Sequence, residues 1–372
     1  MPLKALATSI PEALARACVL ARRGMYEVEP NPMVGAVVLA GDRVVGEGWH
    51  RAWGAPHAEV EALAAAGTAA RGGTLCVTLE PCSTKGKTPP CTEAIVAAGV
   101  ARVVVGRLDP NPVHHGRGIE RLLAAGVEVD LLEHEGPGAL LTRFPAQLAS
   151  RRPHVLAKWA MSRDGAIAPA RGGRVAVSGA ESQALVHRWR ACADALVVGV
   201  NTVIADDPLL TVRGDVAPHR TLRRVVLDPS LRTPLGARIV NTPDQAPTWI
   251  LAAGDASPGA EAALRARGAV VLRVPRGPDW LAAGLERLAA EGCGRVLVEG
   301  GSHTLASCLA ADVVDQAAIF MSPNNLGEGA LPAVRGYRLG RLSPHEVATA
   351  LGLTDCRVLS SGADTLLRGF RH

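Results

Sequence analysis

The chain has 372 residues, 48% of them hydrophobic, and a formal net charge of +5 at pH 7. This composition excludes global disorder, and the length is typical of two domains of roughly 100–200 residues each. No run of about 18 uncharged apolar residues occurs, and the arginines are dispersed, which excludes a membrane span and argues against a basic nucleic-acid-binding tail.

The predicted elements of the first half alternate between helices and strands. Ser9 and Glu12 have the spacing of a capping box at the start of a helix over 9–24, and a hairpin follows over 34–47. We then expect a helix over 57–66, a strand over 74–79, a helix over 91–98, a strand over 102–105, and a helix and a strand within 118–132. This order predicts an α/β sheet with helices on its faces.

A Gly- and Pro-rich segment over 133–153 predicts a domain boundary near residue 147. The elements expected after it are strands at 155–160, 195–200, 223–227, 248–252, 269–273, 295–298 and 315–321, and helices at 179–193, 258–267, 279–291 and 302–310. The sequence therefore predicts two α/β domains, residues 1–147 and 148–372. No secretory signal is evident, so we expect a cytoplasmic protein.

Four residues of the first half point to metal chemistry. His57 and the cysteines Cys82 and Cys91 are the residue types that bind zinc, and three protein ligands leave a fourth position for water. Glu59, two residues after His57, can stand beside that water and move protons without binding the metal. Nucleobase deaminases use this logic with the signature H-x-E…P-C-x-x-C, although here Cys91 comes nine positions after Cys82.

The alternatives are a buried histidine with two core cysteines, or a structural zinc site. A structural site fits less well, because only three clear ligands are present and a carboxylate stands beside the first. The remaining six of the eight cysteines are expected to be core or incidental residues, since a disulfide scaffold would be smaller and richer in cysteine.

Longer motifs surround these residues. The run from Glu80 to Cys91 (E-P-C-S-T-K-G-K-T-P-P-C), the segments 31–35 and 48–50, and the pair 109–112 and 116–118 together resemble the bifunctional deaminase-reductase of riboflavin biosynthesis. The resemblance implies a cytidine-deaminase-like α/β/α domain. Its implied reaction is zinc-dependent deamination of 2,5-diamino-6-(5-phosphoribosylamino)pyrimidin-4-one. The residues implied to bind this substrate are Asn31, His50, Lys87, Thr88, Asp109 and Asn111. Thr84 departs from the histidine usual in the family.

The second half resembles the reductase domain of the same family, in the segments 158–165, 195–213 and 298–301. This implies a dihydrofolate-reductase-like α/β domain in which NADPH reduces the ribose of 5-amino-6-(5-phosphoribosylamino)uracil to a ribityl chain. Lys158 and Glu299 would lie near the reacting carbon. The implied substrate contacts are Arg190, Leu210 and Arg213, and the implied cofactor contacts are Ala160, Thr202, Asp206, Gly300 and Gly301.

Three departures keep other interpretations open. Arg174 and Ala176 stand where the family has serine and tryptophan, and Asn324 replaces a lysine. The main alternative is therefore a deaminase whose C-terminal domain has lost reduction and acts structurally. A nucleic-acid-editing deaminase is disfavoured by the 3% aromatic content, and a zinc-binding interaction module would not need Glu59. We expect small phosphorylated pyrimidines as partners, no nucleic acid or membrane, and, from the resemblance, a homo-oligomer.

Overall fold

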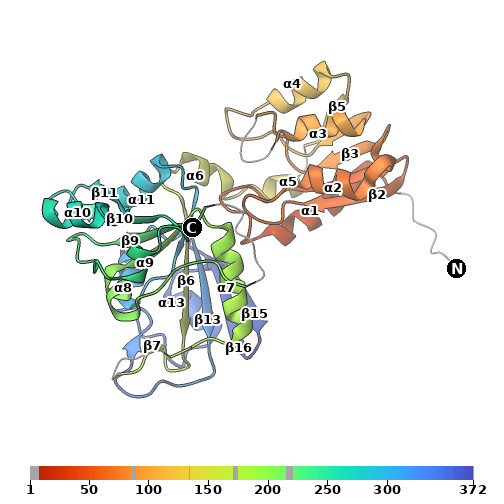
Figure 1. Ribbon diagram of the computed structural model, residues 1–372. Coiled ribbons are helices and arrows are strands. Elements are labelled where there is room, and N and C mark those ends of the chain that lie inside the picture. Colours follow the sequence, from red (N-terminus) through yellow and green to blue (C-terminus); the bar gives the residue numbers. More distant parts are fainter. Residues whose placement is uncertain (1–7, 85–88, 134, 171–174, 215–220, 372) are drawn as a thin grey trace. The chain divides into compact units, whose positions relative to one another are not determined.

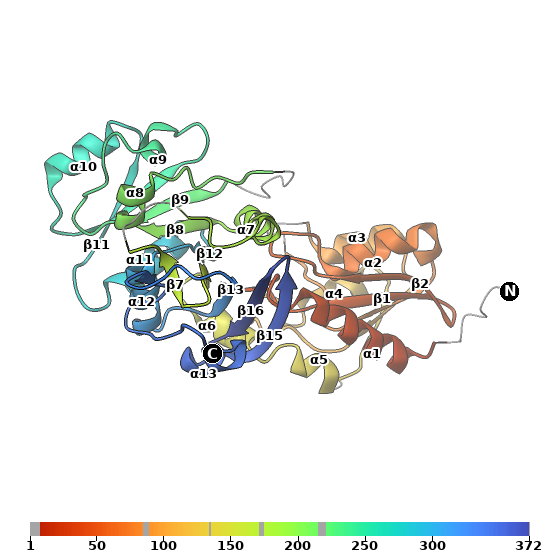
Figure 2. The same ribbon diagram turned by 90° about the horizontal axis from the view of Figure 1, so that it is seen from below.

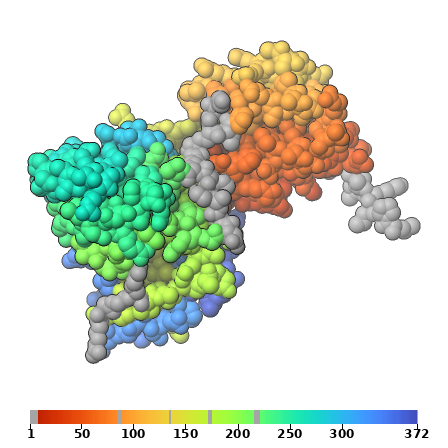
Figure 3. All heavy atoms as spheres, viewed as in Figure 1, coloured from red at the N-terminus to blue at the C-terminus, as the bar shows by residue number. Residues whose placement is uncertain are grey.

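The computed structural model describes residues 8–84, 89–133, 135–170, 175–214 and 221–371. The chain forms two compact units, residues 1–150 and 151–372 (Figure 1). In the space-filling view the atoms of the first unit are coloured from red to yellow, and those of the second unit from yellow-green to blue (Figure 3). None of the helices in the described part of the chain is long and apolar enough to cross a membrane.

The first unit is built on a five-stranded sheet with the order β2-β1-β3-β4-β5. The strands are β1 Gly35–Ala40, β2 Arg43–Trp49, β3 Thr74–Val77, β4 Arg102–Val105 and β5 Glu128–Leu131. Strand β1 runs antiparallel to both β2 and β3, whereas β3, β4 and β5 are parallel. The carboxyl ends of β3 and β4 therefore lie at one edge of the sheet, and the loops that follow them carry the candidate site.

Helices cover both faces of this sheet. The covering helices are α1 Ile10–Ala21, α2 Ala58–Ala66, α3 Cys91–Ala98 and α4 Arg117–Ala124. The unit also contains the short helices α5 Glu135–Ala139 and α6 Phe144–Ala149, and single 3₁₀ turns at Arg22–Gly24 and Gly67–Ala70. The apolar side of α1 packs on one face, and α2, α3 and α4 share the core on the other. Helix α2 lies close to β2 because β2 has glycine there: a Cβ at Gly48 would meet the Ala58 carbonyl oxygen at 2.4 Å.

The second unit has a nine-stranded sheet with the order β11-β10-β9-β8-β12-β6-β13-β16-β15, and a small β14-β7 pair. Its strands are β6 His154–Met161, β7 Ala166–Ala168, β8 Ala195–Gly199, β9 Arg223–Leu227, β10 Thr248–Ala253, β11 Val270–Val274, β12 Arg295–Val298, β13 Gln316–Met321, β14 Leu331–Pro332, β15 Thr354–Ser361 and β16 Asp364–Phe370. The strands from β11 to β13 are parallel, and β16 and β15 add an antiparallel edge.

Helices also cover both faces of the second sheet. They are α7 Ala180–Cys192, α8 Val200–Asp206, α9 Arg238–Asn241, α10 Pro258–Arg265, α11 Trp280–Ala290, α12 Ser302–Ala310 and α13 Pro344–Ala350. One core joins the sheet to α11, α12 and α13, and the other joins it to α7, α8, α9 and α10. Figure 2 shows α9 and α10 on one side of this sheet and α12 and α13 on the other.

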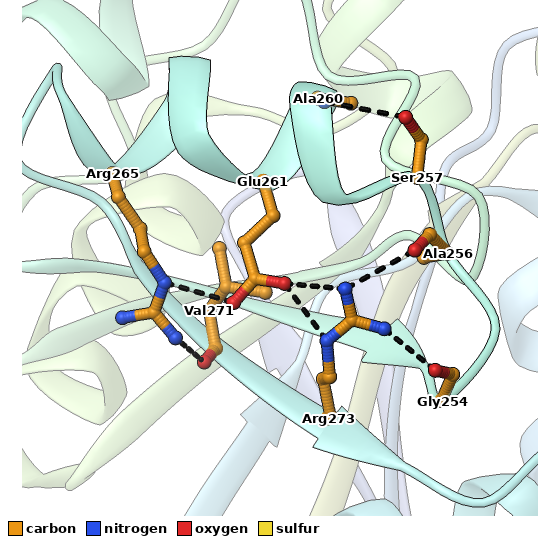
Figure 4. Close-up of polar contacts among 8 residues, drawn as sticks. All are labelled: Gly254, Ala256, Ser257, Ala260, Glu261, Arg265, Val271 and Arg273. Atoms are coloured by element: carbon orange, nitrogen blue, oxygen red, sulfur yellow. Dashed lines mark hydrogen bonds and ion pairs between the residues drawn. The ribbon is translucent and has the colours of Figure 1, made fainter.

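A polar network holds α10 against the end of β11 (Figure 4). The Glu261 carboxylate accepts hydrogen bonds from the Nε atoms of Arg265 and Arg273, each at 2.8 Å. Arg273 also donates to the carbonyl oxygens of Gly254 and Ala256, at 2.6 and 3.1 Å. These charge-assisted bonds satisfy loop carbonyls at the outer edge of the sheet, where β11 has no further strand in the described chain.

The fold class predicted from the sequence is confirmed. Many of the predicted boundaries differ from the observed ones by a few residues. Two of these differences have a clear cause: the strand expected at 195–200 ends at Gly199, because Val200 begins α8, and His57 precedes its helix as the N-terminal cap residue. The elements that the sequence analysis did not predict are α5, α6, β7, α8, α9, β14, α13, β15 and β16.

Candidate active sites

The three predicted zinc ligands converge at the beginnings of two helices. His57 directly precedes α2, Cys91 is the first residue of α3, and Cys82 lies in the loop after β3. Nδ1 of His57 lies 3.1 Å from Sγ of Cys91 and 3.6 Å from Sγ of Cys82, and the three ligand atoms lie within 4.8 Å of one another. One imidazole and two thiols at this separation fit a zinc ion with one position open to water.

The surroundings of one of the two sulfur atoms, Sγ of Cys82, favour a thiolate, whereas the Cys82 side chain and burial raise the pKa of the Cys91 thiol. The backbone N–H of Cys91 donates to Sγ of Cys82 at 3.3 Å, at the N-terminal end of α3. A hydrogen bond with the Cys91 side chain lowers the pKa of the Cys82 thiol well below its usual range. This effect outweighs burial, which raises the pKa. The N-terminal end of a helix also favours negative charge, so it stabilises the thiolate form of cysteine, which is the form that binds a metal.

Glu59 lies in the first turn of α2 and is 3% exposed. Burial raises the pKa of its carboxyl, although the nearby His57 opposes this effect. The carboxyl is not among the three converging ligand atoms. A buried acid beside the metal ligands is the arrangement that general acid–base catalysis needs.

Asn31 and His50 form one wall of the same site. Nδ1 of His50 lies 3.0 Å from the carbonyl oxygen of Pro56, which can only accept a hydrogen bond, so Nδ1 carries the proton. Nε2 is then the acceptor for the Asn31 amide at 3.1 Å. Burial lowers the pKa of His50 to about 4, which keeps the ring neutral at pH 7.

The loop between β4 and α4 is fixed by one buried carboxylate, that of Glu80. Its Oε2 accepts from the backbone N–H groups of Asp109 and Gly116, at 3.1 and 2.9 Å, and its Oε1 accepts from Gly118 at 2.8 Å and more weakly from Ile119. Gly118 must be glycine, since a Cβ there would meet the Pro81 carbonyl oxygen at 2.0 Å. These four hydrogen bonds, the Glu80 clamp, therefore tie this loop to the segment that carries Cys82.

His57, Glu59 and Cys82 line a cavity of about 460 Å³ within the first unit, whereas Cys91 is not among its lining residues. The predicted residues that line it are Asn31, His50, His57, Glu59, Cys82, Asp109 and Asn111. The other two predicted substrate residues, Lys87 and Thr88, lie outside the described residues. The structure adds Thr84 and His114, and Nδ1 of His114 lies 3.4 Å from the Thr84 hydroxyl oxygen.

The second unit holds a larger cavity of about 1410 Å³ at the carboxyl ends of β8 and β12. In a parallel sheet this is the edge where ligands bind, and here β12 lies between β8 and β6. The predicted residues that line it are Thr202, Asp206, Leu210, Glu299 and Gly301. The others predicted for this unit, Lys158, Ala160, Arg190, Arg213 and Gly300, are not among its lining residues.

Glu299 links the cavity to two of those residues. Arg190 pairs with its carboxylate through two hydrogen bonds of 2.7 and 2.8 Å and donates a third bond to the Thr211 carbonyl oxygen. Nζ of Lys158 lies 3.9 Å from the same carboxylate. Burial lowers the pKa of the Lys158 ammonium, and Arg190 and Lys158 together outweigh burial to lower the pKa of Glu299. The Arg190 guanidinium is thus paired within the protein, whereas Arg213 is exposed and its backbone N–H lies 3.1 Å from Nδ1 of His187.

The beginning of α12 fits a cofactor phosphate. A Cβ at Gly300 would meet Cβ of Thr304 at 2.5 Å, so the chain can turn this tightly into α12 only with glycine there. Ser302, in the first turn, lines the cavity and is buried, and its hydroxyl has no hydrogen-bond partner among the described residues. A helix N-terminus with a buried free hydroxyl suits a phosphate oxygen.

Three basic side chains on this cavity were missed by the sequence analysis: Arg232, His303 and Arg335. Nη2 of Arg232 donates to Oδ1 of Asn201 at 2.9 Å, and Nη1 of Arg335 lies 2.9 Å from Nε2 of His303. No motif marked them, because they come from three separate loops and helix starts. Of the departures noted in the sequence, Arg174 lies outside the described residues. Ala176 is not among the residues that line the cavity, but its neighbour Val175 is.

Together the fold and the two cavities define a two-domain enzyme, a zinc-binding deaminase joined to a reductase. Residues 8–107 match the cytidine and deoxycytidylate deaminase zinc-binding region, and residues 153–364 match the RibD C-terminal domain. The chain belongs to the family of the riboflavin biosynthesis protein RibD. It is 39% identical over 349 residues to that protein from Aquifex aeolicus, covering 94% of each chain, and 36% identical over 332 residues to that from Escherichia coli, covering 85% of this chain and 88% of the other.

Solved structures agree with this assignment. RibD of Acinetobacter baumannii has a TM-score of 0.68 at 31% identity, with 97% of this chain and 98% of that chain covered. The diaminohydroxyphosphoribosylaminopyrimidine deaminase/5-amino-6-(5-phosphoribosylamino)uracil reductase of Thermotoga maritima has a TM-score of 0.66 at 32% identity, with the same coverage. Because the similarity spans both domains, it gives no support to a C-terminal domain that has lost reduction.

Proposed function

We propose that this chain catalyses two successive steps of riboflavin biosynthesis. The first is deamination of 2,5-diamino-6-(5-phosphoribosylamino)pyrimidin-4-one, and the second is NADPH-dependent reduction of the ribose of the product. The observation that carries the proposal is the convergence of His57, Cys82 and Cys91 beside the buried Glu59. Residues 1–147 are proposed as the deaminase domain and 148–372 as the reductase domain.

In the deaminase, each residue has a proposed task. His57, Cys82 and Cys91 would hold zinc, which supplies a Lewis acid that activates water for attack on the ring carbon. The Glu59 carboxylate takes a proton from the attacking water and delivers one to the departing amino nitrogen, so that ammonia leaves and a carbonyl remains. Asn31 and His50 bind the pyrimidine, and the loop that carries Asp109 and Asn111, together with Lys87 and Thr88, binds the ribose phosphate.

In the reductase, NADPH would supply, when bound, a hydride for C1′ of the ribose. The bond from C1′ to the ring oxygen breaks, and that oxygen takes up a proton. Lys158 is the proposed source of this proton, because burial lowers the pKa of its ammonium, and Glu299 holds it in place with Arg190. Ala160, Thr202, Asp206, Gly300 and Gly301 are the proposed cofactor contacts, with Leu210 and Arg213 on the substrate.

The substitution Glu59→Gln tests the deaminase. Because Glu59 moves protons and does not bind metal, the variant should keep about one zinc ion per chain, while its deamination rate falls at least about a hundredfold. Metal analysis and an ammonia-release assay measure the two effects. Loss of zinc would make Glu59 a ligand, and an unchanged rate would remove it from catalysis. Cys82→Ala is the matched control, since it should lose zinc and activity together.

Two further features are proposed at a coarser level. A homo-oligomer is implied by the family resemblance, and the molar mass of the protein in solution tests it. A cytoplasmic location stays a prediction from the sequence, and fractionation of cells that express the chain tests it.

A further inference from the structure

The first cavity carries an imidazole that the proposed mechanism does not use, that of His114. It belongs to the loop between β4 and α4, and it lines the same cavity as His57, Glu59 and Cys82. Its Nδ1 lies 3.4 Å from the hydroxyl oxygen of Thr84, and the described residues make no other hydrogen bond to the ring. The contact with Thr84 engages Nδ1, so Nε2 has no hydrogen-bond partner among the described residues and can bind a ligand in the cavity.

The backbone on both sides of this imidazole is fixed. The backbone N–H of His114 donates to the Asn111 carbonyl oxygen at 2.8 Å, and its carbonyl oxygen accepts from the Arg117 N–H at 2.9 Å. Two residues further on, Gly116 is held by the Glu80 carboxylate. The ring is therefore presented by an ordered loop, which favours a binding role because little entropy is lost when a ligand is bound.

His57, Cys82, Thr84 and His114 line one cavity, and Thr84 marks its exposed end. At the metal end Cys91 and Glu59 are buried, whereas His57 and Cys82 are half-buried, as is His114. A substrate whose ring reaches the metal ligands can place its ribose phosphate at the exposed end, beside Thr84 and His114. Asp109, the acidic residue of the same loop, also lines this cavity, and its Oδ1 accepts the Asn111 N–H at 2.8 Å.

The chemistry of the two side chains differs in the way that matters for phosphate. An imidazole can donate a hydrogen bond and, when protonated, carries a positive charge, whereas the Thr84 hydroxyl can donate a hydrogen bond but stays neutral. Hydrogen bonds between charged partners are about twice as strong as neutral ones. Thr84 stands where the resemblance leads us to expect histidine, and the His114 ring lies beside it on the facing loop.

We infer that His114 binds the 5′-phosphate of the deaminase substrate and, in this chain, supplies the imidazole that position 84 lacks. The inference rests on the proposed deaminase function. It makes His114 a specificity residue, since it distinguishes phosphorylated from dephosphorylated ribosylaminopyrimidine and takes no part in proton transfer at the ring.

Steady-state deamination by His114→Ala tests this inference. The KM for the phosphorylated substrate should rise about tenfold while kcat stays within about twofold, as expected when one charge-assisted hydrogen bond to the ground state is lost. The KM for the dephosphorylated substrate should not change, and zinc content should stay at about one per chain. An unchanged KM for the phosphorylated substrate, or an equal rise for both substrates, would overturn the inference.

His115→Ala is the control for damage to the loop, because His115 is adjacent, exposed and outside the cavity lining, while its Nδ1 lies 2.9 Å from the Asp109 carbonyl oxygen. An equal rise in KM in this variant would assign the effect to loop damage and overturn the role of His114. Calorimetric titration with ribose 5-phosphate separates this inference from the proposed function. Weaker binding by His114→Ala than by the wild type supports the phosphate site even if deamination itself is not observed.

Discussion

Glu80 shows how much of the deaminase site depends on one side chain. Its carboxylate accepts hydrogen bonds from four backbone N–H groups, two in the loop that carries Asp109 and Asn111 and two in the first turn of α4, and it is 4% exposed. In Glu80→Gln an amide NH₂ would face two of those donors. We expect a loss of about 2–4 kcal/mol in the unfolding free energy of the first unit, since buried hydrogen bonds to a charged group are lost and donors are left without acceptors.

Thermal and urea unfolding of the two proteins measure this loss. Glu120→Gln is the control, because Glu120 is exposed on the neighbouring α4, and its effect should stay within about 0.5 kcal/mol. Equal stability of Glu80→Gln and the wild type would mean that the four contacts are individually weak. The clamp would then have no part in holding the loop.

Short motifs made the metal set predictable at this scale, whereas contacts between distant loops were not predictable. His57, Glu59, Cys82 and Cys91 are distinctive in type and spacing, and the structure brings the three ligands together. The contact between Thr84 and His114 joins loops 30 positions apart, with no periodicity to indicate it. Likewise, Arg190 was expected to contact a substrate phosphate, and nothing in the sequence indicated that its guanidinium pairs with Glu299.

At the scale of elements, the beginning of β6 contains a pH-sensitive contact. His154 is 4% exposed; Nε2 lies 3.4 Å from the Gln316 amide oxygen at the start of β13, and burial lowers its pKa to about 4. The unfolded chain binds the proton at an ordinary pKa of about 6.5. Stability from this residue is therefore complete above about pH 6.5 and is lost as the pH falls toward 4.

Unfolding of the wild type and His154→Gln at pH 7.5 and pH 5 tests this effect. Between pH 7.5 and pH 5 the unfolding free energy of the wild type should fall by about 2 kcal/mol more than that of the variant, because glutamine does not titrate. The loss begins at the unfolded-state pKa of about 6.5, and the roughly 1.5 pH units from there to pH 5 correspond to about 2 kcal/mol. His345→Gln, at an exposed position of the same unit, should behave as the wild type. Parallel losses in all three proteins would show that His154 is not the sensitive group.

Elements were predictable where one apolar pattern continued for several residues, as in β8 and β12, and they were missed where it did not. Strands β15 and β16 mix charged, polar and apolar residues at the sheet edge, where β15 is largely exposed. Helix α13 had a recognisable signal, since Ser343 and Glu346 form a capping box with a 2.7 Å bond from the Ser343 N–H to the Glu346 carboxylate. Applying the capping rule beyond residue 321 would have found it.

At the scale of the whole molecule, each unit contains its own cavity and its own core. Every residue of the metal set and of the first cavity lies within 1–150, and every residue of the second cavity lies within 151–372. The two reactions also differ in kind, because one is a hydrolysis and the other a hydride transfer. The chemistry of each can therefore be abolished without the other, although both activities belong to one chain.

Removal of zinc from the intact protein provides the test. Dialysis against a chelator should abolish deamination, because His57, Cys82 and Cys91 are the proposed ligands and lie in one unit. NADPH oxidation, followed at the nicotinamide absorbance band with the deaminated ribosylaminouracil phosphate supplied directly, should stay within about twofold of its original rate. Added zinc should restore deamination.

If oxidation is lost together with the metal and returns with it, the reductase depends on the zinc unit, and the two sites are coupled. If the untreated protein deaminates but never oxidises NADPH, the second cavity is not a working reductase site, and the replacements at Arg174 and Ala176 become the first residues to revert.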